Sequence, residues 1–222
     1  MHTILKEVLR REEIERLKAM ISSQAFVDGR STSALASKNN LQLAFDNPTS
    51  KECGELVLRR LCEHELFERS VHPVAIHPVL FSRYEQGMQY PDHVDVAIMA
   101  GLRTDVAITL FLNDLEQYEG GELVTDTGNG VRSYRLAAGD AIAYPASSVH
   151  HVAKVTRGER LAAVLWVQSR IRDAERRSIL FDLDCVARRL ASTACGPRLS
   201  RSYWNLLLAW SDAGAVNAGQ PA

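Results

Sequence analysis

The first third of the chain has apolar side chains at helical spacing. Ile14, Leu17 and Ile21 stand between charged residues, a pattern that places one apolar face on a helix. Thr49 or Ser50 is the expected cap of a later helix. The predicted elements are a helix at about residues 9–21, a loop at 26–40 and a second helix at about 51–69. These helices are typical of a support for a sheet formed further along.

The hydrophobic period shortens to about two residues beyond His72. Strands are predicted at residues 74–76, 79–81, 103–113, 131–136, 140–144, 149–155 and 160–168, and the turn at 119–122 leads into another. The turn signals between strands include a hairpin-like loop at 126–130, Gly139-Asp140, Pro145 and Arg157-Gly158. No alternation of strands and helices indicates a parallel sheet. Short strands with regular turns favour a β-sandwich or barrel of jelly-roll type.

Helical spacing returns after Gln168. Asp173 is the expected cap of a helix that ends at Gly196-Pro197, and another helix is expected at about residues 202–210. The apolar face expected for the first helix consists of Ile179, Leu180, Leu183, Val186 and Leu190. On the second helix, Tyr203, Trp204 and Trp210 are expected to face inward, with an oligomer contact as the alternative. The tail that follows is expected to be disordered.

The composition is that of an ordinary globular protein and gives no sign of a nucleic-acid or membrane partner. The formal charge of −1 gives no electrostatic reason to expect nucleic acid or an anionic membrane as a partner. The 222 residues are 46% hydrophobic and 24% charged, as in ordinary globular proteins, and contain no run of 18 apolar residues. The four cysteines form no Cys-x-x-Cys motif, which is typical of reduced thiols. We therefore expect a soluble, cytoplasmic protein without a membrane partner.

A candidate metal site begins at His93-Val94-Asp95. In an extended strand, residues i and i+2 point to the same face, so His93 and Asp95 offer an imidazole and a carboxylate side by side. A histidine from a second strand would complete a 2-His-1-carboxylate triad, which holds Fe(II) and leaves coordination positions open. His150 and His151 are both candidates, because alternation turns only one of them inward and does not decide which.

Arg160 opens a strand that is apolar on both faces. Ala162, Val164 and Trp166 share its face, and the other face is apolar throughout, as in the middle of a covered sheet. A buried arginine needs a partner, because an unpaired buried charge is costly. A carboxylate co-substrate would supply one through a bidentate pair.

Taken together, these motifs resemble the PKHD-type hydroxylases, bacterial Fe(II)/2-oxoglutarate dioxygenases related to prolyl 4-hydroxylases. The resemblance rests on Arg83-Tyr84, Tyr90-Pro-Asp-His-Val-Asp95, Gly120-Gly-Glu-Leu123, Gly139-Asp140, Tyr144-Pro145, Ser148-Val-His150, Thr156-Arg-Gly158, Arg160 and Trp166 to Asp173. It implies a mainly β protein with flanking helices: N-terminal helical support at 1–72, a double-stranded β-helix (jelly-roll) core at 73–170, and a C-terminal helical extension with a disordered tail at 171–222.

The resemblance also assigns roles to residues. It matches His93, Asp95 and His150 to the iron ligands, and so selects His150 over His151. Arg160 matches the arginine that binds the distal carboxylate of 2-oxoglutarate. Tyr84 matches a tyrosine that hydrogen-bonds this co-substrate in related prolyl hydroxylases. Trp166 matches an aromatic residue that lines the pocket, and Phe111 stands where some prolyl hydroxylases place a second carboxylate-binding tyrosine.

The expected reaction is hydroxylation of a substrate C–H bond by O₂, with decarboxylation of 2-oxoglutarate to succinate. The carboxylate of Asp95 indicates a hydroxylase, since relatives with Ala or Gly there leave room for a halide. No catalytic residue beyond the metal centre is expected, and ascorbate is an implied reductant. The substrate, a peptidyl residue or a small molecule, stays open, as does a homo-oligomer. The alternative function is a cupin-like metal-binding or 2-oxoglutarate- or iron-sensing protein without turnover.

Overall fold

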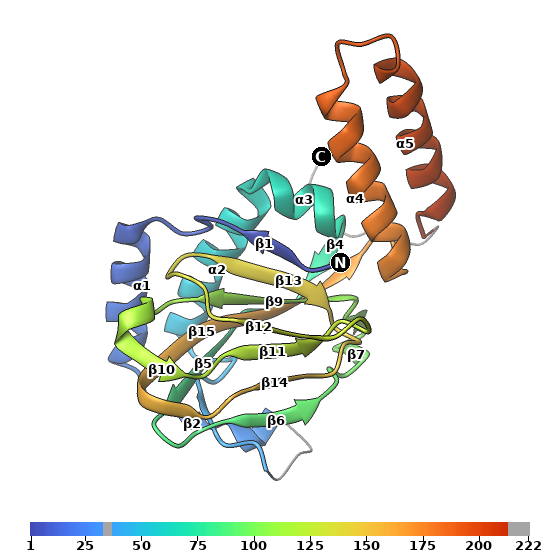
Figure 1. The fold of residues 1–222 in the computed structure, drawn as a ribbon. Coiled ribbons are helices and arrows are strands. Elements are labelled where there is room, and N and C mark those ends of the chain that lie inside the picture. Colours follow the sequence, from blue (N-terminus) through green and yellow to red (C-terminus); the bar gives the residue numbers. More distant parts are fainter. Residues whose placement is uncertain (33–36, 213–222) are drawn as a thin grey trace.

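A large antiparallel sheet forms one layer of the molecule (Figure 1). The computed structural model describes residues 1–32 and 37–212. The strands of this sheet lie in the order β1 (Thr3–Leu5), β13 (Ala141–Pro145), β9 (Val106–Phe111), β15 (Val155–Ser169), β5 (Leu80–Glu85), β3 (Leu41–Gln42) and β2 (Val27–Asp28). Two further strands, β4 (Pro73–Ile76) and β10 (Tyr118–Gly120), also pair with β15.

A smaller sheet lies against the large one and completes the jelly roll. Its order is β12 (Val131–Tyr134), β11 (Leu123–Asp126), β14 (His150–Val152) and β6 (Tyr90–His93). A separate hairpin joins β7 (Ile98–Met99) to β8 (Leu102–Arg103). The strand pairings described are antiparallel, and the two sheets are not closed into a barrel. The predicted mainly β jelly-roll fold is confirmed.

β15 is the central strand of the large sheet. It pairs with β9 on one side and with β5 on the other, so its backbone is hydrogen-bonded along both edges. Leu161, Ala163 and Leu165 belong to the core beneath the helices, whereas Arg160 and Trp166 face the space between the sheets. This is the division of faces that the alternation predicts.

The N-terminal helices cover the outer face of the large sheet (Figure 1). They are α1 (Arg11–Ser22), α2 (Pro48–Glu63) and α3 (Glu65–Val71). The single helix predicted at 51–69 is wrong, because His64 adopts an extended conformation and separates α2 from α3. The expected caps Thr49 and Ser50 are also wrong: the side chain of Asn47 accepts a hydrogen bond from the Ser50 amide, and Pro48 begins α2.

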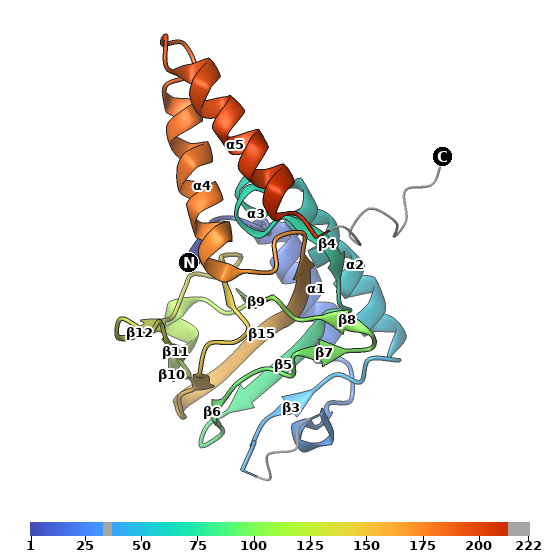
Figure 2. The same cartoon turned by 90° about the vertical axis from the view of Figure 1, so that its right-hand side faces the viewer.

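The C-terminal helices form a hairpin that projects from the sheets (Figure 2). Asp173 caps α4 (Ala174–Arg189) as predicted. Gly196-Pro197 begins α5 (Gly196–Trp210) instead of ending α4, because proline fits the first turn of a helix. The inward face expected for α5 is wrong for Trp204, which is 63% exposed. On α4, Leu180 is buried but Ile179 and Val186 are exposed, since a two-helix hairpin leaves much of each helix uncovered.

Several element boundaries differ from the sequence prediction. Arg157-Gly158 is not a turn: Gly158 lies inside β15, where a side chain would overlap the backbone of the adjoining segment at Gln117. β6 ends at His93, so Asp95 lies on the loop that follows and not on the strand. The loop expected at 26–40 contains β2 and the short 3-10 helix η1 (Gly29–Thr32), and a second such helix, η2, spans Leu115–Gln117.

Two further expectations concern the C-terminal tail and membrane-spanning segments. The tail predicted to be disordered lies outside the described residues. Within residues 1–32 and 37–212, no helix is both long enough and apolar enough to cross a membrane.

Candidate active site

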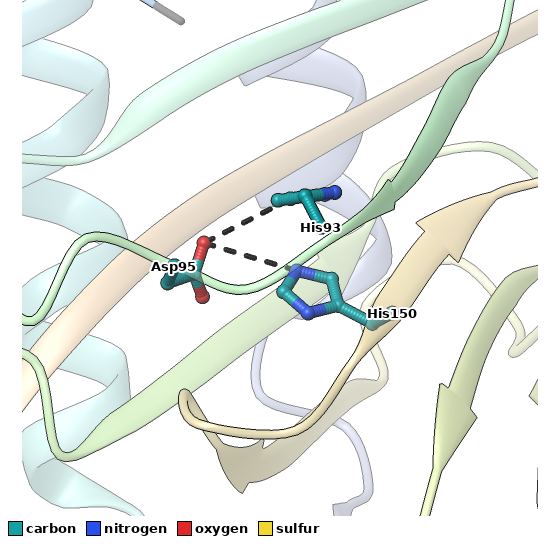
Figure 3. A group of neighbouring side chains, drawn as sticks. All are labelled: His93, Asp95 and His150. Atoms are coloured by element: carbon teal, nitrogen blue, oxygen red, sulfur yellow. Dashed lines mark ion pairs between the residues drawn. The ribbon is translucent and has the colours of Figure 1, made fainter. Parts of the chain in front are cut away.

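Three potential metal ligands meet at one end of the smaller sheet (Figure 3). His93 and His150 are direct partners on the neighbouring strands β6 and β14, and Asp95 reaches them from the loop after β6. Each of the three offers one ligand atom, and these atoms lie within 4.8 Å of one another. The backbone amide of Asp95 donates to the carbonyl of Ala146, which holds the loop against the end of β13. The structure therefore brings together the three residues that the sequence singled out.

Hydrogen bonds orient both imidazoles toward the same point. His93 Nδ1 lies 2.9 Å from the Pro91 carbonyl oxygen, and His150 Nδ1 lies 2.9 Å from that of Ser148. A carbonyl can only accept, so Nδ1 carries the proton and Nε2 presents its lone pair. Both Nε2 atoms face Asp95 Oδ1, at 3.9 Å from His93 and 3.8 Å from His150. Such backbone partners fix the tautomer of metal-binding histidines.

His151 lies on the opposite face of β14. Its Nδ1 is 2.6 Å from a carboxylate oxygen of Asp92, and both side chains are partly open to solvent. His151 is therefore outside the cluster that contains His150. Alternation along the strand explains why only one of the two adjacent histidines takes part.

Burial shifts the protonation equilibria of the cluster in opposite directions. It lowers the pKa of His93 to about 4, with a further contribution from the neighbouring His150. It raises the pKa of the Asp95 carboxyl, against the attraction of His150 and Lys38. Desolvation disfavours the charged form of each group. At neutral pH the imidazole of His93 is thus neutral, with its Nε2 lone pair available to a metal. Asp95 Oδ2 has no hydrogen bond of normal geometry among the described residues.

Arg160 is buried beside this cluster, with 1% of its surface exposed. Its guanidinium lies 5.3 Å from the ring centroids of both Tyr84 and Phe111, and Tyr84 is its direct partner across β15 and β5. In the described part of the chain, Nε of Arg160 has no hydrogen-bond partner and no carboxylate pairs with the side chain. Phe111 thus contacts the cation with its ring where a tyrosine would offer a hydroxyl.

Gly121 makes room for the Arg160 side chain. It follows Gly120 with a positive φ of 67°, and an added Cβ would lie 3.0 Å from Cδ of Arg160 and 2.9 Å from Val155 Cγ2. Such distances are shorter than normal carbon contacts, so any larger residue would press on the arginine. The Gly-Gly pair of the sequence motif therefore has a steric reason.

One cavity of about 260 Å³ between the sheets is lined by His93, Asp95, His150, Tyr84 and Arg160. Its other described lining residues include Thr32, Lys38, Gln42, Phe45, Leu80, Ser82, Tyr90, Val94, Val96, Met99, Thr109, Leu123, Tyr144, Val152, Val164 and Trp166. Tyr90 stacks on His93 at 3.7 Å between centroids, and Tyr144 approaches His150 edge-on at 5.2 Å. Sequence reasoning quoted both tyrosines as parts of motifs without giving either a role.

Lys38 is the lining residue that the sequence gave no reason to select. It lies in the N-terminal segment read as a loop, and 4% of its surface is exposed. Burial lowers the pKa of its amine to about 8, while Asp28 and Asp95 pull in the other direction. The amine therefore remains charged at neutral pH. No periodic pattern surrounds Lys38, so only the folded structure places it in the cavity.

The donor set fits a transition metal and an anion bound next to each other. Two imidazole nitrogens and one carboxylate oxygen on one side of a metal are the donors that non-haem Fe(II) oxygenases use. The guanidinium of Arg160, unpaired and buried in the same cavity, fits a carboxylate better than it fits any described neighbour. In both cases the groups concerned, the three potential metal ligands and the Arg160 guanidinium, have donor or acceptor atoms without a partner in the described part of the chain.

Comparison with known proteins is consistent with this chemistry. Residues 79–168 match the 2OG-Fe(II) oxygenase superfamily. A PKHD-type hydroxylase of Acaryochloris marina is 47% identical over 215 residues, covering 94% of this chain and 98% of that protein. A PKHD-type hydroxylase of Picosynechococcus is 45% identical over 216 residues, with the same two coverages.

Solved structures with little sequence identity share the fold. A prolyl hydroxylase from Trichoplax adhaerens, in complex with a hypoxia inducible factor peptide fragment, aligns with a TM-score of 0.58 at 14% identity. The alignment covers 80% of this chain and 86% of that one. A Pseudomonas putida prolyl-4-hydroxylase aligns with a TM-score of 0.53 at 17% identity, covering 76% and 92%.

Proposed function

The chain belongs to the PKHD-type hydroxylases of the 2OG-Fe(II) oxygenase superfamily, and on that premise we propose that His93, Asp95 and His150 hold its Fe(II). Arg160 binds the distal carboxylate of 2-oxoglutarate. The observation that carries the proposal is the pairing of a preformed three-ligand cluster with an unpaired buried guanidinium in one cavity. A metal-binding protein without the co-substrate has no use for that guanidinium.

The bound iron supplies O₂ activation for hydroxylation of a C–H bond, coupled to oxidative decarboxylation of 2-oxoglutarate to succinate and CO₂. The chain supplies position and environment. Arg160 fixes the co-substrate by a bidentate pair that Lys could not form. Tyr84, its cross-strand partner, lines the same end of the cavity and donates a hydrogen bond to the co-substrate. Val164 and Trp166 provide an apolar wall that limits water near the reacting atoms.

The test is an anaerobic titration of the purified protein with Fe(II) and 2-oxoglutarate. We expect the weak visible charge-transfer band of the iron–co-substrate chelate, and succinate release when air is admitted. His150→Ala removes the band, whereas the matched variant His151→Ala retains it, because His151 lies outside the cluster. Absence of both band and succinate at saturating iron would overturn the proposal and favour a protein that binds metal without the co-substrate. Loss of the band in His151→Ala alone would mean that the ligand assignment is wrong.

A further inference from the structure

Lys38 is a second buried cation in the cavity that contains Arg160. It follows η1 and precedes β3, and its Nζ donates to the hydroxyl of Thr32 at 3.0 Å. The same Nζ lies 4.8 Å from the centroid of the Tyr90 ring, and Tyr90 in turn stacks on His93. The Tyr90 ring therefore contacts both Lys38 and the candidate metal ligand His93.

No acidic side chain in the described part of the chain forms an ion pair with Lys38. Asp28, which attracts it, is held by the guanidinium of Arg30. Asp95 is the carboxylate among the described lining residues. With iron and co-substrate in place, the charges of Asp95 and the 2-oxoglutarate dianion balance those of Fe(II) and Arg160. The charge of Lys38, which is 4% exposed, is left without compensation, and an uncompensated buried charge is costly.

The wall around this cation is apolar. Phe45, Val94 and Val96 line the cavity and remain substantially exposed, which apolar side chains do at ligand-binding surfaces. The cavity of about 260 Å³ lies below the usual range for a single drug-sized ligand, and 2-oxoglutarate takes part of it. The part of a substrate that enters the cavity beside the co-substrate must therefore be small.

We propose that Lys38 binds a carboxylate of the primary substrate, and that this substrate is a small amphipathic carboxylic acid whose apolar part lies against Phe45, Val94 and Val96. The inference rests on the proposed function, because it takes Arg160 to be occupied by 2-oxoglutarate. Lys38 is a binding residue in this scheme: it holds the substrate by a charge-assisted hydrogen bond and orients its apolar carbons toward the metal cluster.

The test uses hexanoate and hexanamide, a pair of probes that differ in charge but hardly in size. Calorimetry under anaerobic conditions measures their binding to protein saturated with Fe(II) and 2-oxoglutarate, while the visible band reports that the co-substrate stays bound. We expect hexanoate to bind at least about tenfold more tightly than hexanamide, because one charge-assisted hydrogen bond contributes about this difference in affinity. Lys38→Met abolishes this preference, and Lys38→Arg restores part of it.

Lys51→Met is the matched control. Lys51 is exposed on α2, so this substitution removes the same charge at a position outside the cavity. It should keep the wild-type preference. The proposal is overturned if acid and amide bind equally, if the preference survives in Lys38→Met, or if hexanoate weakens the band by displacing 2-oxoglutarate. A purely structural role for Lys38, as an anchor of the Thr32 segment, predicts altered stability in Lys38→Met with an unchanged preference. Absence of the band in wild type would instead contradict the proposed function.

Discussion

At the scale of single residues, the site is built from groups whose charge or bonding capacity the folded chain does not satisfy. Arg160 is buried among two aromatic rings without a carboxylate, and Asp95 keeps one oxygen unbonded. Unpaired buried groups reduce stability, so a chain retains them where a ligand completes them. These unpaired groups therefore lower the free energy of unfolding of the unliganded protein, relative to the same fold with apolar groups in their place.

Replacing Arg160 by Met should separate stability from binding. In protein free of iron and 2-oxoglutarate, Arg160→Met is expected to raise the free energy of unfolding by about 1 kcal/mol or more, since an unpaired buried charge disappears. The further rise in Tm that 2-oxoglutarate adds to that of Fe(II) alone in wild type should be lost, because the three iron ligands remain in place. Thermal unfolding with and without ligands measures both effects.

Arg157→Met is the control for this substitution. Arg157 lies on the same strand but is exposed and pairs with exposed Glu119, so its removal should change stability by less than about 0.5 kcal/mol. It should also keep the full response to ligands. A ligand-free Arg160→Met protein that is less stable than wild type would contradict the view that this charge is unpaired.

Gly121 allows a second residue-scale prediction. Gly121→Ala combines the strain of a positive φ with pressure on Arg160, so it should cost about 2–3 kcal/mol and weaken 2-oxoglutarate binding. Gly128→Ala, at a φ of 78° with nothing within 4 Å of the added Cβ, carries the backbone strain alone. It should cost about 1 kcal/mol and leave co-substrate affinity unchanged. Urea unfolding and anaerobic titration of both variants provide the comparison.

The residues of the site could be predicted from sequence to different extents. His93 and Arg160 have a local signal, a short motif in one case and a charged residue on an apolar strand in the other. The choice of His150 over His151 needed the resemblance to the family. Adjacent strand residues face opposite sides, and the strand pattern alone does not show which of the two faces inward. Lys38 had no local signal, since its burial results from how the N-terminal segment folds over the cavity.

At the scale of elements, alternation predicted the faces of β15 but not its beginning. The strand continues through Gly158 because β10 approaches the backbone there, and that approach depends on a partner remote in sequence. The break between α2 and α3 at His64 was missed for a similar reason. Apolar spacing runs through the break, and no Pro or Gly marks it.

The cap of α2 gives a prediction at this scale. Asn47→Ala should lower the free energy of unfolding by about 1 kcal/mol, because the Ser50 amide loses its side-chain acceptor at the first turn of the helix. Asn47→Asp should retain most of the stability, since its carboxylate accepts the same bond. Chemical denaturation of the two variants checks this, and equal losses in both would contradict the capping role.

At the scale of the whole molecule, the sheets and the C-terminal hairpin meet around His72. This residue ends α3 with a positive φ, accepts a hydrogen bond from the Arg170 amide through its carbonyl, and is 6% exposed. Burial, followed by the charges of Arg177 and Arg170, lowers its pKa to about 4, while Asp184 opposes the shift. The imidazole is therefore neutral in the folded protein at neutral pH.

Folding stability should decrease on mild acidification because of His72. The unfolded chain, with a histidine pKa near 6.5, binds more protons than the folded one between about pH 6.5 and pH 4. The contribution of neutral His72 is complete above this window and is lost as the pH falls through it, by up to about 3 kcal/mol. His72→Asn, which tolerates the positive φ, should flatten the pH dependence of unfolding measured by urea titration. An unchanged slope would show that His72 is already accessible to protons.

The two halves of the site differ in their place within the sheets. Arg160 lies on the central strand of the large sheet, whereas His93 lies on β6, at the edge of the smaller one. Edge strands fray at a fraction of the free energy needed to unfold a protein, and central strands do not. Opening of β6 would displace His93 and loosen the adjoining loop that contains Asp95, while the guanidinium of Arg160 stays in position. For the proposed metal site, the rate of metal exchange is then expected to follow local fraying of β6 and not global unfolding.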